Sequence, residues 1–420
     1  MTALRAVGAR TFTSLRVHRN YRLFFSGQIV SVVGTWMQNT ALAWLVVDLT
    51  HSPVAVGFLA FCRFVPFSVF GLVAGVVADR FDNRRLVMTT QAFQMVVSIA
   101  LAVLAFSGQA TVWEAYALAV LGGTGLVFDA PGRNSLTYQL VGRDELPNAI
   151  ALNASLFNAS RVIGPAVAGL AIAATSIGVC FALNAVSFLA VLAALWLMRT
   201  EELFPVENKE RPTVVGGTRE GLRYVRGAPR IRAVLVMTLV VSTVGFNFHV
   251  LVPVLAAETL HVGATMFGVL SAVFGAGALV GALIAAVRSR ASFKALVAGT
   301  GTFSVTMLVL APQHTVLACA ILLFITGISF TTWTANSQSI LQLSAPDHLR
   351  GRVLSLYLLA FAGAAPLGGL LSGWLAHVGG TELAFSVAGI AGLVMTLYGL
   401  HTLRDGRFAP RPVLVPGTRR

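Results

Sequence analysis

The stretch Gly75-Val-Val-Ala-Asp79-Arg80-Phe-Asp-Asn-Arg84-Arg85 is a short charged segment between two long apolar runs. The runs, residues 54–78 and 86–106, are each long enough to cross about 30 Å of hydrocarbon as a helix. Short loops that contain several Lys or Arg residues stay on the cytoplasmic side of a membrane. The stretch therefore predicts two membrane-spanning helices joined by a cytoplasmic loop.

Apolar runs of this kind continue along the whole chain of 420 residues. Twelve runs are candidates for spans: 23–47, 54–78, 86–106, 112–128, 149–174, 177–198, 233–257, 266–287, 296–311, 315–333, 353–376 and 383–403. The composition agrees, because 56% of the residues are hydrophobic and 11% are charged, whereas soluble domains have roughly 25% charged residues. We therefore predict an all-α membrane protein with twelve transmembrane helices.

The basic residues indicate how these spans are oriented. With twelve spans, 28 of the 30 Lys and Arg residues fall at the termini or in the loops on the same side as the termini. The other two, Arg63 and Arg161, lie inside apolar runs. Since basic loops stay in the cytoplasm, both termini are predicted to be cytoplasmic. Arg outnumbers Lys by 28 to 2, which is typical of GC-rich bacterial genomes, so we expect a multi-pass protein of the bacterial inner (cell) membrane.

The net charge of +14 needs a separate explanation, because a basic protein can bind nucleic acid. A nucleic-acid binder gathers its basic residues on one face, with aromatic or polar residues between them. Here the basic residues form short clusters between apolar runs. We expect the lipid bilayer as partner and no nucleic acid.

A polar segment divides the predicted spans six and six. The predicted parts are a cytoplasmic N-terminal segment (1–22), a six-helix bundle (23–198), a cytoplasmic linker (199–232), a second six-helix bundle (233–403) and a cytoplasmic tail (404–420). The halves resemble each other, because Gly125-Leu-Val-Phe128 is echoed by Gly327-Ile-Ser-Phe330, 202 residues further on. Internal repeats are typical of secondary transporters, so we expect two pseudo-symmetric bundles in one monomer.

Two motifs resemble signatures of the major facilitator superfamily. The residues Gly75, Asp79, Arg80, Arg84 and Arg85 match its motif between the second and third helices, and the resemblance implies a cytoplasmic latch whose partners change as the halves rock. The segment Gly164-Pro165-Ala-Val-Ala-Gly169 is similar to its antiporter motif. Small residues there would also let helices approach closely, so packing alone is an alternative explanation of the second motif.

The chain also resembles one branch of that superfamily, the drug and siderophore exporters that include enterobactin exporters and Tap-type multidrug pumps. The resemblance rests on segments such as Gly34-Thr-Trp-Met-Gln38 and Phe128-Asp-Ala-Pro-Gly-Arg133-Asn134. Two features depart from the superfamily pattern. The second half lacks the Asp-Arg pair of the latch motif, and the Arg often found in the fourth helix is absent from residues 112–125.

Three charged residues inside or beside apolar runs are candidates for coupling: Asp129, Arg161 and Arg63. A charge at membrane depth costs several kcal/mol, and it therefore indicates a function by default. Asp129 and Arg161 could form a protonation-sensitive pair, or Arg161 and Arg63 could attract an anionic substrate. Alternatively each charge only ties neighbouring helices together, and Asp129 could pair with Arg133 one turn away.

Polar stripes at helical spacing suggest which residues contact substrate. The candidates are Gln28, Thr35, Trp36, Gln38, Asn39, Ser242, His249, Ser329, Trp333 and Asn336. They belong to the first, seventh and tenth spans, and the resemblance implies that these spans line the central cavity. Polar residues in a span can instead join helices to one another. A wall of amides, hydroxyls and rings with much apolar surface suits amphipathic organic molecules.

Enzymatic chemistry and ATP hydrolysis are not expected. No GxxxxGK[ST] loop occurs, and no cluster of His, Asp or Glu marks a catalytic site. The three Cys residues form no CxxC pair, so neither a metal site nor a cofactor is predicted. We expect a secondary active transporter that exports amphipathic molecules (drugs, a siderophore or a secondary metabolite) in exchange for protons, by alternating access. The alternatives are an importer or lysophospholipid flippase of the same fold, or a membrane sensor or assembly partner that transports nothing.

Overall fold

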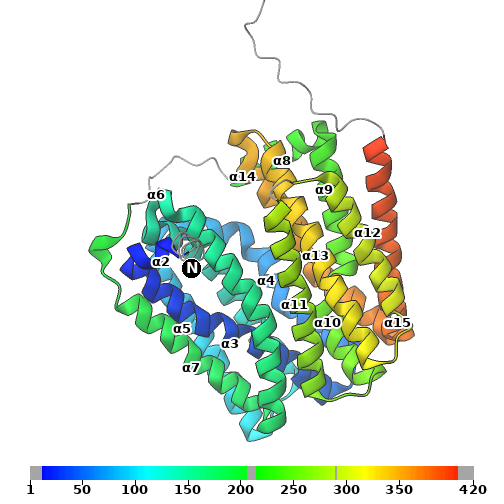
Figure 1. Ribbon diagram of the computed structural model, residues 1–420. Helices are drawn as coiled ribbons and strands as arrows, with labels where there is room; N and C mark the ends of the chain where they lie inside the picture. Colours follow the sequence, from blue (N-terminus) through cyan, green and yellow to red (C-terminus); the bar gives the residue numbers. More distant parts are fainter. Residues whose placement is uncertain (1–11, 206–213, 289–290, 405–420) are drawn as a thin grey trace, which may run out of the picture.

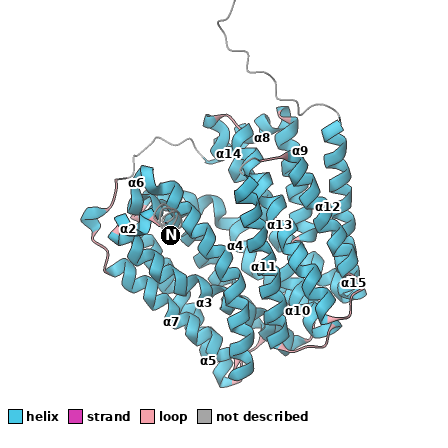
Figure 2. Ribbon diagram, in the orientation of Figure 1, coloured by secondary structure: helices cyan, strands magenta, loops and turns pink. Residues whose placement is uncertain are grey.

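The computed structural model describes residues 12–205, 214–288 and 291–404. The described residues are helical almost throughout, and no strand occurs among them (Figure 2). Parts of the predicted N-terminal segment, linker and tail (1–11, 206–213 and 405–420) lie outside the described residues. The prediction of a helical protein is confirmed.

In the part of the first half that the structure describes, the chain forms six α-helices and one short 3₁₀ turn. They are α2 (Thr13–Val17), α3 (Arg19–Thr50), α4 (Pro53–Arg80), α5 (Asn83–Ser107), α6 (Val112–Ala174), α7 (Ile177–Trp196) and the turn η1 (Thr200–Glu202).

Among its described residues, the second half forms eight α-helices and three π-helical turns. They are α8 (Val214–Gly227), α9 (Pro229–Val240), η2 (Val241–Gly245), α10 (Phe248–Val254), η3 (Leu255–Thr259), α11 (Ala264–Arg288), α12 (Phe293–Leu310), α13 (Val316–Ser344), α14 (Asp347–Leu358), η4 (Leu359–Gly363) and α15 (Ala365–Arg404). Two of these turns follow α9 and α10, so the predicted seventh span is a single interrupted helical segment, Pro229–Thr259.

Ten helical segments in the described part of the chain are long and apolar enough to cross a membrane. Two of them, Val112–Ala174 with 63 residues and Leu349–Arg404 with 56 residues, would be about 95 and 84 Å long if straight. That is far more than the roughly 30 Å of hydrocarbon. Each covers two of the twelve predicted runs, and each is interrupted. A multi-span membrane protein is therefore confirmed, while the number twelve stays a prediction.

Glycines mark both interruptions. In α6 the backbone of Gly142 has φ 70° and ψ −175°, and in α15 Gly380 has φ 67° and ψ −177°. Residues with a Cβ atom rarely adopt this conformation. A Cβ atom on Gly142 would also lie 3.1 Å from the ring of Phe204. The chain therefore turns at these two positions within segments that are otherwise helical.

The charged stretch that follows α4 folds as a helix end and a helix start. Helix α4 ends at Arg80, and Phe81 has extended backbone angles. Asp82 then caps α5, because its carboxylate accepts a hydrogen bond of 2.8 Å from the backbone N–H of Arg85. Asp at an N-cap position satisfies an N–H group that has no partner within the helix. The loop is therefore as short as the sequence predicted.

The two halves of the chain are joined mainly through two helix pairs, α6 with α11 and α4 with α15. Glycines allow both contacts. A Cβ atom on Gly169 would lie 2.9 Å from the carbonyl oxygen of Thr265 and 3.2 Å from the Cα of Gly268, and one on Gly57 would lie 3.0 Å from the Cα of Gly373. Small residues let helix backbones approach closely in a membrane. At these glycines the backbones of the two halves are therefore in direct contact.

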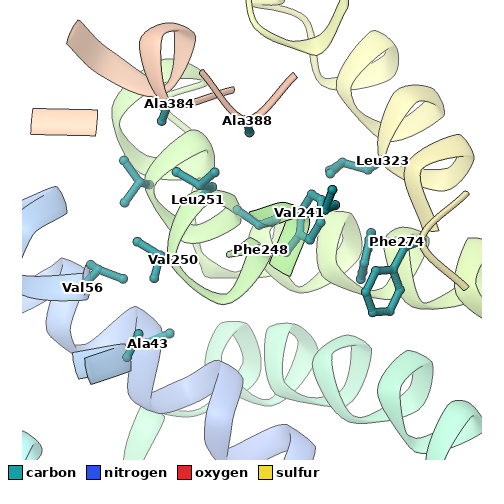
Figure 3. Close-up of a cluster of buried hydrophobic side chains, with 14 of the residues drawn as sticks. Ala43, Val56, Val241, Phe248, Val250, Leu251, Phe274, Leu323, Ala384 and Ala388 are labelled. Atoms are coloured by element: carbon teal, nitrogen blue, oxygen red, sulfur yellow. The ribbon is translucent and has the colours of Figure 1, made fainter. Parts of the chain in front are cut away.

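These contacts gather toward one end of the molecule, and the halves diverge toward the other end (Figure 1). Along α4, Gly57 touches α15, whereas Cβ atoms on Gly71 and Gly75 would meet nothing within 4 Å. The buried apolar residues also join the halves at this end. One apolar cluster contains Ala43 and Val56 from the first half together with side chains of the second half (Figure 3).

A second apolar cluster lies within the first half alone. It includes Tyr21, Phe24, Val87, Leu136 and Val191, and it has no member from the described residues of the second half. The structure is thus two helical bodies with a shared core at one end and separate packing at the other.

Candidate functional site

Asp129 on α6 is enclosed by hydrogen-bond donors of the first half. Its side chain is 1% exposed. One carboxylate oxygen accepts hydrogen bonds from Thr90 (2.9 Å) and from the amide of Gln91 (2.8 Å) on α5. The other accepts from Nε of Arg133 at 2.9 Å and from Nη2 of the same guanidinium. Of the two pairings considered from the sequence, the structure places Arg133 and not Arg161 against this carboxylate.

Arg161 is surrounded by aromatic rings. Its guanidinium carbon lies 5.3 Å from the ring centre of Trp36, 5.4 Å from that of Phe157 and 5.8 Å from that of Phe330. Trp36 belongs to α3 and Phe330 to α13, so the rings come from both halves. A Cβ atom on Gly275 of α11 would lie 2.7 Å from the carbonyl oxygen of Arg161. The residue therefore lies where the two halves meet, and no acidic side chain among the described residues is paired with it.

Arg63 on α4 lies at the same junction. Its Nη1 donates a hydrogen bond to the Oδ1 of Asn39 on α3, and its guanidinium carbon lies 5.9 Å from the ring centre of Phe64. The ring of Phe64 in turn contacts His249 of α10, with 5.1 Å between centroids. Arg63, Asn39 and His249, which we predicted from separate spans, are thus brought to one place.

A polar pocket lies inside the first half, beside Arg63. It is bounded by side chains of α3, α4, α5 and α7 in addition to apolar residues of α6. The polar ones are Thr35, Gln38, Asn39, Arg63, Gln94 and Asn184. Gln38 is held in place, because its Oε1 accepts hydrogen bonds from Ser98 (2.6 Å) and from Asn184 (2.8 Å).

The candidates on α13 are enclosed in the packing of the second half. Trp333 is 0% exposed, and its indole nitrogen is enclosed without a hydrogen-bond partner among the described residues. The Oδ1 of Asn336 accepts a hydrogen bond of 3.0 Å from the backbone N–H of Ser292, the residue that caps α12. In this conformation both side chains support neighbouring helices, so substrate contact by them stays a prediction.

Three further candidates are buried in the same way. Ser242 donates a hydrogen bond of 2.9 Å to the carbonyl of Ala360, and Ser329 donates one of 2.8 Å within its own helix. The amide nitrogen of Gln28 is enclosed and has no partner among the described residues. Of the predicted cavity stripe, the part that lies beside the junction is therefore Trp36, Asn39 and His249, with Thr35 and Gln38 in the adjoining pocket.

The latch residues lie at the diverging end of the molecule. Asp79 and Arg80 are exposed at the end of α4. Arg84 turns toward α7, where its Nε donates a hydrogen bond of 2.7 Å to the carbonyl of Leu195 and its Nη2 donates one of 3.4 Å to that of Trp196. Its guanidinium thus binds carbonyl groups at the end of a helix, where positive charge is favourable. The latch function itself stays a prediction.

The antiporter-type motif packs against both halves. A Cβ atom on Gly164 would lie 2.9 Å from the backbone nitrogen of Met37 on α3. The carbonyl of the next residue, Pro165, faces Gly268, and Gly169 faces the same segment of α11. The motif therefore sets the distance of α6 from one helix of its own half and from one helix of the other.

The structure adds residues that the sequence reasoning did not single out as site residues. They are Thr90, Gln91, Gln94, Phe157 and Phe330. The glutamines occur three residues apart inside the apolar run 86–106. This was a signal of the kind used for the other spans, and it could have identified the third span as part of the site.

Residues 9–406 match the model of a family described as transmembrane secretion effector. The chain belongs to this family. It is therefore a transporter of the major facilitator superfamily, as the motifs implied, and its relatives export small molecules.

Several relatives match almost the whole chain. The staphyloferrin A transporter of Staphylococcus aureus is 26% identical over 90% of this chain and 94% of its own length. The multidrug efflux pump Tap of Mycolicibacterium fortuitum is 27% identical over 93% of this chain and 98% of its own. Macrolide efflux protein A of Streptococcus pyogenes is 22% identical over 89% of this chain and 94% of its own length.

Solved structures show the same fold. A bacterial homologue of the human lysosomal transporter Spinster, in an inward-facing and unoccupied conformation, matches 93% of this chain and 99% of its own with a TM-score of 0.73 and 13% identity. A variant of the nucleoside transporter NupG matches with the same TM-score and 11% identity. This secretion-effector family member is therefore a multi-pass membrane transporter with a major facilitator fold.

Proposed function

We propose that the protein is a secondary active exporter of amphipathic small molecules, driven by protons and working by alternating access. The observation that carries the proposal is the position of Arg161, Arg63 and Asp129. The two arginines lie at the junction of two helical halves that touch at one end only. A charge at this depth is expensive, and transporters retain such charges along substrate and ion pathways.

The proposed topology has twelve spans in two six-helix bundles, with both termini cytoplasmic. Breaks at Gly142 and Gly380 support it, because each divides an overlong helical segment into two pieces of span length. The separation of 28 basic residues onto one side supports the orientation. With this orientation the diverging end faces the cytoplasm of the bacterial cell, and the site opens inward.

The proposed proton-binding residue is Asp129. It is the only acidic side chain among the described residues that is buried, and it lies inside one of the candidate spans. Protonation would remove the charge that holds Arg133 and would leave that guanidinium free to pair elsewhere. Proton binding would in this way alter the packing of α6, the helix that carries Arg161 and the Gly-Pro motif. The proposed transporter is a monomer whose two binding partners are protons and the small-molecule substrate.

The chemistry of the site supports amphipathic organic substrates. The rings of Trp36, Phe157 and Phe330 lie beside polar groups of Asn39 and of the adjoining pocket. Such a wall can bind an apolar body and a few polar groups. The relatives described above are named as a staphyloferrin A transporter, a macrolide efflux protein and a multidrug efflux pump. The substrates in these names belong to the same general class of organic molecule.

The proposal is tested by accumulation of dyes and antibiotics in a bacterium that lacks its own pumps and expresses this chain. We expect lower accumulation of some compounds, and we expect an uncoupler to restore it. Asp129→Asn should abolish the effect of the pump although the protein is present in the membrane. Higher accumulation in expressing cells would indicate an importer instead. Movement of labelled lysophospholipid between leaflets, with no effect on dyes, would indicate a flippase.

A further inference from the structure

The two arginines at the junction of the halves carry charge that the described residues do not neutralise. The described ion pairs are Asp129 with Arg133 and Arg199 with Glu202, so neither Arg63 nor Arg161 is paired with a carboxylate. The carboxylate of Asp129 already forms its ion pair with Arg133. A positive charge inside a membrane protein is costly unless a counter-charge or a water-filled cavity accompanies it.

The guanidinium groups also have unused hydrogen-bond donors. An arginine has five N–H donors, yet the hydrogen bond from Arg63 to Asn39 is the one described for that side chain, and Arg161 contacts rings only. None of their nitrogens is among the fully enclosed atoms that lack a partner. The remaining donors are therefore not fully enclosed, and Arg63 borders the polar pocket of the first half.

Both guanidinium groups lie on the same side of α3. Arg63 binds Asn39, and Arg161 lies over Trp36, which is three residues earlier in the same helix. Residues three apart on a helix are neighbours on its surface, with Cβ atoms about 5–6 Å apart. The two side chains therefore contact neighbouring positions of α3, one on α4 and one on α6.

We propose that Arg63 and Arg161 bind an anionic group of the substrate, so that the protein prefers amphipathic aromatic carboxylates over uncharged molecules of the same shape. Guanidinium groups bind carboxylates through two parallel hydrogen bonds. The rings of Trp36, Phe157 and Phe330 provide apolar surface beside Arg161. The amides of Gln94 and Asn184 border the pocket beside Arg63.

This inference rests on the proposed function, since it concerns the substrate of the same site, but it is tested by binding alone. The probes are 2-naphthoate and 2-naphthamide, which share a ring system and differ in charge. Binding to the purified full chain is measured by calorimetry, with empty detergent micelles as the blank. We expect 2-naphthoate to bind about tenfold or more tightly, because charge-assisted hydrogen bonds are strong.

The variants Arg63→Gln and Arg161→Gln should each lose most of this preference, and their affinity for 2-naphthamide should change little. Arg63→Lys and Arg161→Lys keep the charge and should retain part of the preference, which separates a lost charge from a misfolded site. Arg223→Gln removes an exposed charge from α8 and should leave both affinities unchanged.

Equal affinity for the two probes in the wild type would overturn the inference, and so would a preference that survives in both glutamine variants. Titration with chloride identifies the kind of anion. If chloride at tens of millimolar abolished the preference, the site would bind inorganic anions and the assignment to carboxylates would be wrong. Energy-dependent efflux of uncharged dyes is measured separately, so a failure of the anion site and a failure of export give different results.

Discussion

Arg161 and Phe330 belong to different halves of the chain, and the guanidinium carbon of the first lies 5.8 Å from the ring centre of the second. A cation over an aromatic face contributes about 0.5–2 kcal/mol, with the larger values at sites without water. The contact exists while the halves are closed at this end of the molecule. Under the proposed alternating access, it would stabilise the conformation described here relative to one in which the halves have rocked apart.

Phe330→Ala should shift the population away from this conformation. The lost contact corresponds to a change of roughly 2- to 30-fold in the equilibrium between the two states. The shift can be measured as the distance between spin labels at Phe81→Cys and Leu343→Cys, two exposed positions on α4–α5 and α13, in a background without other cysteines. The control is Phe157→Ala, which removes a ring from Arg161 within the same half. Equal shifts in both variants would contradict the assigned role of Phe330.

Gly169→Ala should stop transport by preventing the close approach of α6 and α11. The added Cβ atom would lie 2.9 Å from the carbonyl oxygen of Thr265 and 3.2 Å from the Cα of Gly268. Backbone atoms cannot move aside as a flexible side chain can, so the halves must separate slightly. Gly71→Ala is the matched control, because its Cβ atom would meet nothing within 4 Å. Efflux rate per amount of folded protein is the measurement, and comparable rates in both variants would contradict this prediction.

Asp129→Asn should destabilise the protein by about 1–3 kcal/mol, because it removes a charged hydrogen-bond acceptor and leaves Arg133 without its counter-charge. Asparagine still has one oxygen that can accept from Thr90 and Gln91. Thermal unfolding in detergent measures the loss. The double variant with Arg133→Gln should recover part of it, as expected for a direct pair. Additive losses in the double variant would show that the two residues do not interact in solution.

Arg84→Ala should lower stability by about 0.3–1 kcal/mol, because the guanidinium binds carbonyl groups at the end of α7, where positive charge is favourable. Arg85→Ala is the control. Arg85 is exposed, and its described hydrogen bonds, to Asp82 and from Thr89, use backbone atoms that the substitution keeps. Both variants remove one cytoplasmic charge under the proposed orientation, so a difference in unfolding temperature measures the contact with α7. Identical unfolding temperatures would indicate that Arg84 acts through charge alone.

Much of the fold could be predicted because a bilayer restricts the structures that cross it. Backbone groups in hydrocarbon must be bonded internally, so long apolar runs such as 54–78 and 86–106 had to be helices, and their ends could be located from charges alone. The limit of this reasoning appears at Gly142 and Gly380. The sequence shows apolar runs on either side of each, but only the backbone angles show a turn inside a segment that is otherwise helical.

The candidate site was predicted less completely. Arg63 and Arg161 could be found because each is a charge within an apolar run. Their surroundings could not be found, since the rings around Arg161 come from three helices, and ordinary phenylalanines in a span such as Phe157 and Phe330 carry no distinguishing signal. The same limit applies to Trp333 and Asn336. Their helical spacing matches that of cavity residues, but the structure encloses both side chains within the second half.

By itself, the sequence determined that this protein is a helical membrane protein, because composition and basic loops depend on local chemistry alone. The resemblance of the motif from Gly75 to Arg85 added the major facilitator superfamily. Only the tertiary structure decided that Asp129 pairs with Arg133 and that Arg161 lies between rings of both halves. Partners are set by how helices far apart in the chain pack against one another. Glycines such as Gly169 and Gly268 permit that packing, but hydropathy and spacing do not reveal which helices they bring together.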